Sequence, residues 1–126
     1  MNSTKKKILV ADDDAAILDV MKMVLSSEYD VETVRDGSVI SRIQEDPPDL
    51  VLMDVWMAHL DGRDICRALK QSFTTQDIPV LMISASHNVG RSTKAAGADD
   101  FIEKPFDIDV LLNKISDLTA TSSGPS

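Results

Sequence analysis

Aspartates follow directly after two of the apolar runs in this sequence. Asp12, Asp13 and Asp14 end the first run, and Asp54 ends another in the middle of the chain. If these runs are neighbouring strands, at least three carboxylates meet at one edge of a sheet, where they raise one another's pKa unless a cation lies among them. Mg²⁺ fits best, because it is a hard ion bound by one or two carboxylates, carbonyls, waters and phosphate oxygens. The pattern therefore predicts a magnesium site around Asp54.

Acidic residues after a strand often do no more than cap the next helix, and that is the interpretation we favour for Asp14. A cap uses a single side chain, so further carboxylates would add repulsion without adding a capping hydrogen bond. Asp12 and Asp13 are therefore assigned to the metal rather than to the helix.

A hydroxyl and an ammonium group stand at corresponding positions after two later runs. Ser84 closes the run Val80–Ile83, and Lys104 follows the short run Phe101–Ile102. With Asp54 as nucleophile, Mg²⁺ and Lys104 would balance the charge of a transferring phosphoryl group, and Ser84 would donate a hydrogen bond to it. The side chains that follow four runs thus predict one phosphoryl-transfer site.

Five short runs of apolar or alternating residues must carry these side chains, and such runs are typical of strands. Three of them are continuously apolar, as expected for strands that helices cover on both faces. The five runs are Ile8–Ala11, Tyr29–Val34, Leu50–Met53, Val80–Ile83 and Phe101–Ile102.

Apolar residues at helical spacing lie between the runs, so strand and helix alternate five times. Helices are expected after Asp14, after Asp36, after Asp61, over Asn88–Ala96 and after Pro105. The fourth is polar and contains a glycine, so we expect it to be short. The alternation predicts an α/β fold with a parallel sheet, right-handed crossovers and helices on both faces. In such folds the functional crevice lies at the carboxyl ends of the strands.

The composition narrows the class of protein. A net charge of −8 argues against a nucleic-acid footprint, which needs clustered Lys and Arg. The run Lys5–Lys7 is interpreted as a solvated strand start rather than a phosphate-binding patch. Cys66 is the single cysteine, so no intrachain disulfide is possible and the thiol is assigned to packing. No signal-peptide run or membrane span is present in the sequence, which predicts a cytoplasmic protein with no membrane partner.

The motifs in this order resemble the receiver domain of two-component response regulators, from Lys7 to about Leu118. The resemblance implies a flavodoxin-like, doubly wound fold with strand order 2-1-3-4-5. It implies a receiver domain over residues 1–119 and a disordered tail or linker over 120–126. The matching motifs are Ala11–Asp14, Asp49–Asp54 with Met57 and Asp61–Gly62, Ser84–Ala85, Gly97–Phe101 and Lys104–Phe106.

The same resemblance implies roles for the site residues. Asp13 and Asp54 would bind Mg²⁺ directly, Asp12 through water, and Trp56 through its backbone carbonyl. Asp54 would accept the phosphoryl group from a phosphohistidine of a sensor histidine kinase or a histidine phosphotransfer protein. The response would pass through the fourth helix, fifth strand and fifth helix to a downstream protein, from a monomer or weak dimer with no external substrate to turn over.

Two further expectations follow from the family. Ser84 and Phe101 would couple phosphorylation to shape, although ordinary core packing explains Phe101 equally well. The Lys104–Pro105 peptide bond is expected to be cis.

The sequence departs from the family at several positions. Ala58 replaces a usual proline, which would leave its loop less rigid. Trp56 stands at a position that in the family borders the path of the attacking water, which predicts slow hydrolysis; an exposed ring at a partner interface is the alternative. The segment from Ser84 to Lys104 is about two residues short in the region of the fourth helix. His59 and His87 are expected at the surface.

Three other functions compete with a phosphorylated switch. A pseudo-receiver scaffold with constitutive contacts is disfavoured because all the site residues are present. A phosphohydrolase with a nucleophilic Asp would need an acid where Trp56 stands. A nucleotide binder would need a glycine- or hydroxyl-rich phosphate loop where the three aspartates stand. No DNA-binding or enzymatic output segment is expected after Leu118, so the chain is expected to act by protein contact or to be a piece cut from a longer protein.

Overall fold

The computed structural model describes residues 5–57, 60–85 and 90–123. The expectations about Ala58, His59 and His87 lie outside the described residues. Among the residues described, no helix has the length and apolar character needed to cross a membrane.

Five parallel strands form the central sheet, in the order β2-β1-β3-β6-β7. Counted along the chain, these strands have the predicted order 2-1-3-4-5. β3 and β6 lie at the centre, and all their residues are buried, which is why their sequences are continuously apolar. The strands are β1 (Lys6–Ala11), β2 (Tyr29–Val34), β3 (Leu50–Asp54), β6 (Val80–Ser84) and β7 (Asp100–Glu103).

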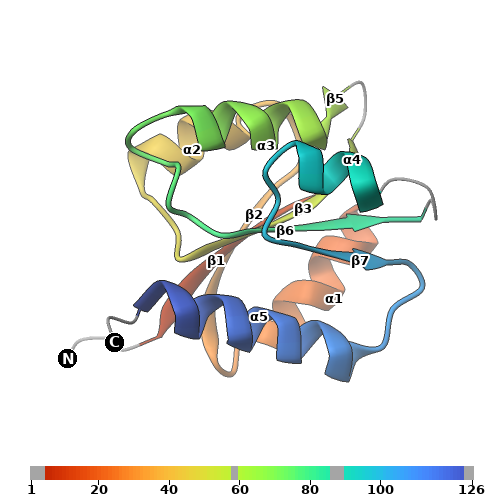
Figure 1. Ribbon diagram of the computed structural model, residues 1–126. Coiled ribbons are helices and arrows are strands. Elements are labelled where there is room, and N and C mark those ends of the chain that lie inside the picture. The colour runs from red at the N-terminus through yellow and green to blue at the C-terminus, as the bar shows by residue number, and fades with distance from the viewer. Residues whose placement is uncertain (1–4, 58–59, 86–89, 124–126) are drawn as a thin grey trace.

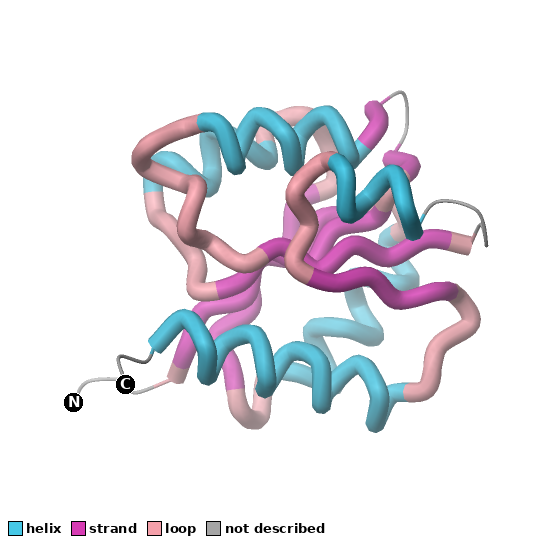
Figure 2. Tube along the Cα trace, viewed as in Figure 1, coloured by secondary structure: helices cyan, strands magenta, loops and turns pink. Residues whose placement is uncertain are grey.

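Helices cover both faces of the sheet, as the alternation of elements predicted (Figures 1 and 2). α1 (Ala15–Leu25) and α5 (Ile108–Ser123) lie on one face. α2 (Val39–Glu45), α3 (Gly62–Gln71) and α4 (Gly90–Ala95) lie on the other. Successive residues of a strand point to opposite faces, so the buried apolar side chains form two separate clusters, one under each helical layer.

Two aspartates begin the helices that the sequence placed after them. The Asp14 carboxylate accepts a hydrogen bond of 2.9 Å from the Ala16 backbone N–H at the start of α1. Asp61 accepts one of the same length from the Arg63 N–H at the start of α3. Each bond satisfies a backbone donor that has no partner within the helix. The capping role of Asp14 is therefore confirmed.

One element differs from the expectation. α5 continues to Ser123, into residues 120–126, which the sequence assigned to a tail. Within this helix the buried hydroxyl of Thr119 donates to the Ile115 carbonyl at 2.9 Å. α4 has six residues and is short, as its polar sequence predicted.

A small hairpin after β3 was not predicted. β4 (Trp56–Met57) and β5 (Leu60–Asp61) pair in antiparallel fashion, with Trp56 opposite Asp61. Strands of two residues are too short to show a hydrophobic period, which explains why sequence patterns missed them. The hairpin connects the end of β3 to the first turn of α3, so it lies directly beside Asp54.

Gly62 lets the start of α3 approach the end of β3 closely. A Cβ atom at this position would lie 2.4 Å from the Asp54 carbonyl oxygen and 3.2 Å from that of Val55. The Gly62 N–H donates to the Val55 carbonyl at 2.5 Å, which fixes the approach. Any side chain here would therefore push the hairpin and the carboxyl end of β3 apart.

We expect Gly62→Ala to lower the free energy of unfolding by about 1 to 3 kcal/mol, the range for inserting atoms into a packed region. Gly37→Ala is the matched control, because its Cβ would meet only the flexible end of Leu60 at 3.5 Å. That control should stay within about 0.5 kcal/mol of the parent. Urea denaturation of the three proteins measures both differences, and equal stability of Gly62→Ala and the parent would contradict the close contact.

Candidate functional site

Three carboxylates meet at the carboxyl ends of β1 and β3. The two strands are neighbours, and Ala11 pairs with Met53, so Asp12 and Asp54 occupy equivalent positions in the sheet. Oxygen atoms of Asp12, Asp13 and Asp54 all lie within 4.8 Å of one another. Ligand oxygens around one octahedral Mg²⁺ are about 3 to 4 Å apart, since each bond measures about 2.1 Å. The donor set and its spacing therefore fit a magnesium ion after small movements.

Lys104 supplies the positive charge of the site. Its ammonium nitrogen lies 3.6 Å from Asp12 Oδ2 and 3.8 Å from Asp54 Oδ1. Both separations are longer than a charge-assisted hydrogen bond, so the lysine stands near the carboxylates without being locked to either one. The structure thus brings together the lysine and the acids that the sequence predicted.

Burial and mutual repulsion both disfavour negative charge on Asp54. Loss of hydration, together with the charge of Asp12, raises the pKa of Asp54 to about 6. Lys104 and a hydrogen bond from the Trp56 backbone N–H oppose this rise without cancelling it. Burial also raises the pKa of Asp12, against a 3.0 Å hydrogen bond from the Asp14 N–H. The pocket is therefore short of positive charge, which is the condition for binding a cation.

Ser84 ends β6, the strand next to β3. Asp54 pairs with Ile83, so Ser84 lies one residue further towards the carboxyl edge, and its side chain is buried. Its carbonyl accepts a hydrogen bond of 2.7 Å from the Lys104 N–H. This bond ties the serine and the lysine to one another at the edge where the acids lie.

Phe101 lies on β7, next to Met82 of β6. Its ring is partly buried and packs against the apolar cluster under α2, α3 and α4. This position agrees with core packing, and the coupling role of Phe101 stays a prediction. The Lys104–Pro105 peptide bond is cis, as expected. Cys66 is fully buried, which raises the pKa of its thiol to about 11 and agrees with its assignment to packing.

Trp56 has neighbours that sequence patterns did not reveal. The ring is 54% exposed, and the guanidinium carbon of Arg63 lies 4.8 Å from its centroid. Arg63 in turn binds Asp61 through two nitrogen atoms, at 2.8 and 2.7 Å. The Asp61-Gly62-Arg63 sequence could have indicated an ion pair between the acid and the base. It could not have indicated that the Trp56 ring stacks on the guanidinium.

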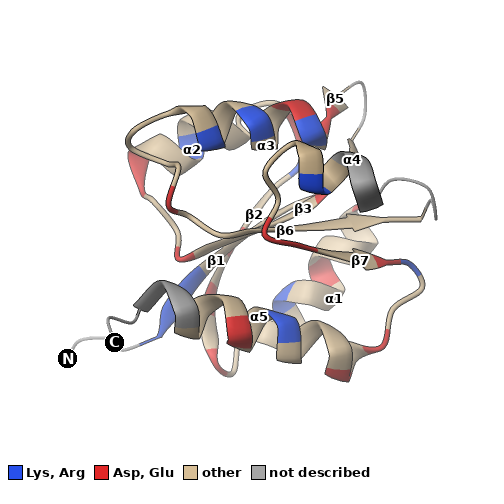
Figure 3. Cartoon of the chain, viewed as in Figure 1, with Lys and Arg blue, Asp and Glu red and all other residues tan. Residues whose placement is uncertain are grey.

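Charges elsewhere are interspersed over both helical layers (Figure 3). Lys7, from the lysine run at the start of β1, forms ion pairs with Glu32 at 2.7 Å and Asp46 at 2.6 Å. Burial is the largest single influence on the pKa of Lys7 and lowers it. Asp46 and Glu32 together outweigh burial, so the pKa is raised overall. Lys7 therefore has a structural role, in line with the interpretation of the run.

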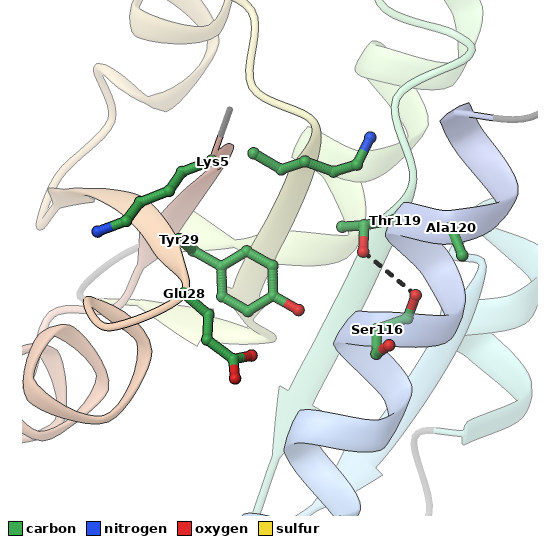
Figure 4. A pocket seen from close by; sticks show the side chains of 7 residues that line it. Lys5, Glu28, Tyr29, Ser116, Thr119 and Ala120 are labelled. Carbon is green, nitrogen blue, oxygen red and sulfur yellow. Dashed lines mark hydrogen bonds between the residues drawn. The ribbon is translucent and has the colours of Figure 1, made fainter. Parts of the chain in front are cut away.

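A separate hollow of about 430 Å³ lies at the amino end of the sheet, remote from the carboxylates (Figure 4). It is open and mixed in polarity, and Tyr29 lines it across from Ser116. The other lining residues are Lys5, Lys6, Glu28, Thr119 and Ala120. The hollow shares no residue with the acidic site and takes no part in its chemistry.

The chain matches the model of the response regulator receiver domain over residues 8–116. The chain belongs to this family. Response regulator MprA from Mycolicibacterium vanbaalenii is 39% identical over 113 residues, which cover 86% of this chain and 48% of that protein. This receiver therefore spans about half the length of the curated relatives it matches.

Solved receiver structures agree with the fold. The receiver domain of NtrX from Brucella abortus is 35% identical, with a TM-score of 0.82 over 90% of this chain and 98% of that one. Chemotaxis response regulator CheY4 of Vibrio cholerae is 27% identical, with a TM-score of 0.84 over 91% of this chain and 99% of that one. The resemblance drawn from the sequence motifs is confirmed at the level of family and fold.

The pKa of Asp54 predicts how this receiver responds to pH without metal. Because the pKa lies above the ordinary value of 3.8, the folded state binds this proton more tightly than the unfolded state. The contribution of Asp54 to stability is therefore full below about pH 3.8 and is lost as pH rises through about 6. Asp54→Asn removes this dependence, so it should raise the free energy of unfolding at pH 7.5 by about 1 to 3 kcal/mol.

Urea denaturation with chelator at pH 7.5 and pH 4 measures this effect, and the difference between the two proteins should disappear at the lower pH. Asp36→Asn is the control, because hydrogen bonds from Ser38 lower the pKa of Asp36 and its neutralisation should bring no gain. Equal stability of Asp54→Asn and the parent at pH 7.5 would contradict the electrostatic description of the pocket.

Proposed function

We propose that this receiver is a phosphorylation-activated switch of a two-component or phosphorelay system, with Asp54 as the acceptor. The observation that carries the proposal is the position of Asp54, buried between two further carboxylates and one lysine at the carboxyl edge of the sheet. The phosphoryl donor is a phosphohistidine of a sensor histidine kinase or a histidine phosphotransfer protein.

The transfer replaces one bond to phosphorus with another. An oxygen of the ionised Asp54 carboxylate attacks the phosphorus atom, and the bond between phosphorus and the donor imidazole nitrogen breaks. Mg²⁺ would supply positive charge to the phosphoryl oxygens and favour the ionised form of Asp54. Asp13 and Asp54 would hold the ion directly, Asp12 through water, and Trp56 through its backbone carbonyl.

The chain's own residues orient and stabilise the phosphoryl group. Lys104 stands between 3.6 and 3.8 Å from the carboxylates, so a short movement brings its ammonium to a phosphoryl oxygen. Ser84 donates its hydroxyl proton in a hydrogen bond from the adjacent strand. These preorganised donors match the charge that develops in the transition state.

The output is a change in protein binding. Movement of Ser84 towards the phosphoryl group and of the Phe101 ring into the fold alters the surface formed by α4, β7 and α5, where a downstream protein binds. The chain turns over no external substrate, acts in the cytoplasm, and is a monomer or weak dimer. It binds neither nucleic acid nor membrane, in agreement with its interspersed surface charges (Figure 3).

Acetyl phosphate tests the acceptor chemistry without a kinase. Incubation with this donor and Mg²⁺ should give one phosphoryl adduct by intact mass, and the adduct should be absent from Asp54→Asn and after chelation. Failure of well-folded protein to form an adduct, or to change on adding beryllofluoride with Mg²⁺, would favour a pseudo-receiver scaffold with constitutive partners.

Neighbouring aspartates provide a matched pair of variants for the metal. Asp13→Asn removes a metal ligand and should raise the Mg²⁺ concentration for half-maximal adduct formation by about ten- to a hundredfold. Asp14→Asn removes the same charge one residue further on, but asparagine caps a helix equally well, so the Mg²⁺ dependence should stay within about twofold. Equal dependence in the two variants would contradict the assignment of Asp13 to the metal.

A further inference from the structure

β7 is a short strand at the edge of the sheet, and Lys104 follows directly after it. The strand has four residues, and its register with β6 sets Glu103 beside Ser84. Each strand residue advances about 3.3 Å, so a slip by one residue would move Lys104 by that distance and reverse the direction of its side chain. The separations of 3.6 and 3.8 Å between its ammonium and the two nearest carboxylates therefore depend on the register of β7.

Asp99 fixes this register at the opposite end of the strand. Its backbone N–H donates to the Val80 carbonyl at 2.9 Å, and its carboxylate accepts from the Val80 N–H at 2.8 Å. Two hydrogen bonds between the same two residues define one alignment, because a slip would break both at once. The Asp99 side chain thus adds a further step to the ladder between β6 and β7.

Lys70, on the last turn of α3, holds the Asp99 carboxylate in place. Its ammonium lies 2.9 Å from the same Asp99 oxygen, Oδ2, and donates to the Ile78 carbonyl at 2.8 Å. The lysine side chain is 18% exposed, so both contacts are partly shielded from water. An oxygen that accepts from an ammonium and from a backbone N–H has little freedom to rotate away. Lys70 and Asp99 together form a clamp between α3, β6 and β7.

A glycine makes room for the lysine at the turn before β7. A Cβ atom at Gly97 would lie 2.9 Å from Lys70 Cγ. The backbone of Gly97 also has a φ of +99°, which residues with a Cβ atom rarely adopt. Gly97 therefore lets the aliphatic stem of Lys70 pass this turn and reach Asp99.

The clamp and the acidic site lie at opposite ends of β7. From Asp99 to Lys104 an extended strand covers about 16 Å. At the far end, the Lys104 N–H donates to the Ser84 carbonyl at 2.7 Å. Lys114 of α5 pairs with Asp100 at 2.9 Å, which ties β7 to a helix rather than to β6. An effect of the clamp on the acidic site therefore passes along the strand.

We propose that Lys70 and Asp99 are positioning residues for Lys104: by fixing the register of β7 against β6, they hold its ammonium within reach of the phosphoryl group on Asp54. This inference rests on the proposed function. The clamp itself makes and breaks no covalent bond. It acts on the transfer by keeping a cation where negative charge develops, and displacement of that cation by about one ångström loses much of the stabilisation.

Amide hydrogen exchange tests the register without phosphorylation. In Lys70→Met and in Asp99→Asn, the Lys104 amide should exchange about three- to tenfold faster, the factor for losing one partly exposed charged contact. Asp49 provides the reference amide, because its N–H donates to the Lys7 carbonyl at 2.8 Å between β1 and β3. Unchanged exchange at Lys104, or the same acceleration at both amides, would contradict the proposal.

Adduct formation tests the consequence for the reaction. With acetyl phosphate and Mg²⁺, Lys70→Met should form the adduct about three- to tenfold more slowly, because the ammonium of Lys104 is less often in place. In a Lys104→Ala background the same change should not slow the reaction further, since the group through which it acts is gone. Equal slowing in both backgrounds, or no slowing in the single variant, would overturn the proposal.

Two neighbouring ion pairs provide the matched controls. Arg67→Met removes a pair of the same 2.9 Å length on α3, between Arg67 and Asp64. Lys114→Met releases β7 from α5 but leaves its alignment with β6. Both should keep the parent rate, and the parent exchange at Lys104, within about twofold. A parent that forms no adduct would refute the proposed function together with the effect on transfer, whereas a normal parent adduct and an unchanged rate in Lys70→Met would refute the clamp alone.

Discussion

The properties of the acidic site depend on the cost of ionising Asp54 at the end of a buried strand. β3 has apolar neighbours on both sides and helices on both faces, so water cannot hydrate the carboxylate fully. Asp12 ends the adjacent strand and adds its own charge. A single lysine offsets this charge only in part, and the folded protein therefore keeps a local demand for cations.

The scaffold holds this unfavourable arrangement because its stability comes from elsewhere. Two apolar clusters, one on each face of the sheet, fix the register of β1, β3 and β6 without help from the acidic edge. Register matters here, since a slip by one residue would turn every side chain of a strand to the opposite face. The same clusters hold the Asp12 and Asp54 carboxylates close together at one edge of the sheet.

The sequence predicted the parts of the molecule that repeat a period or a motif. Continuous apolar runs at Leu50–Met53 and Val80–Ile83 indicated central strands, and the aspartates after them indicated the acidic edge. The hairpin at Trp56–Asp61 was missed because two-residue strands have no period. The continuation of α5 to Ser123 was missed because the polar residues at its end show no apolar period. Contacts between distant side chains, such as Arg63 over Trp56, depend on tertiary structure and leave no local pattern.

The features that the sequence predicted and those that it missed lie in different parts of the fold. The residues proposed to bind and transfer a phosphoryl group stand at strand ends, where the buried sheet fixes their positions within narrow limits. The residues around them belong to short loops and first helical turns, where an exposed side chain can change without disturbing the core. Asp61, Gly62 and Arg63 lie on this boundary, since a helix cap, a close backbone contact and an exposed stack meet there.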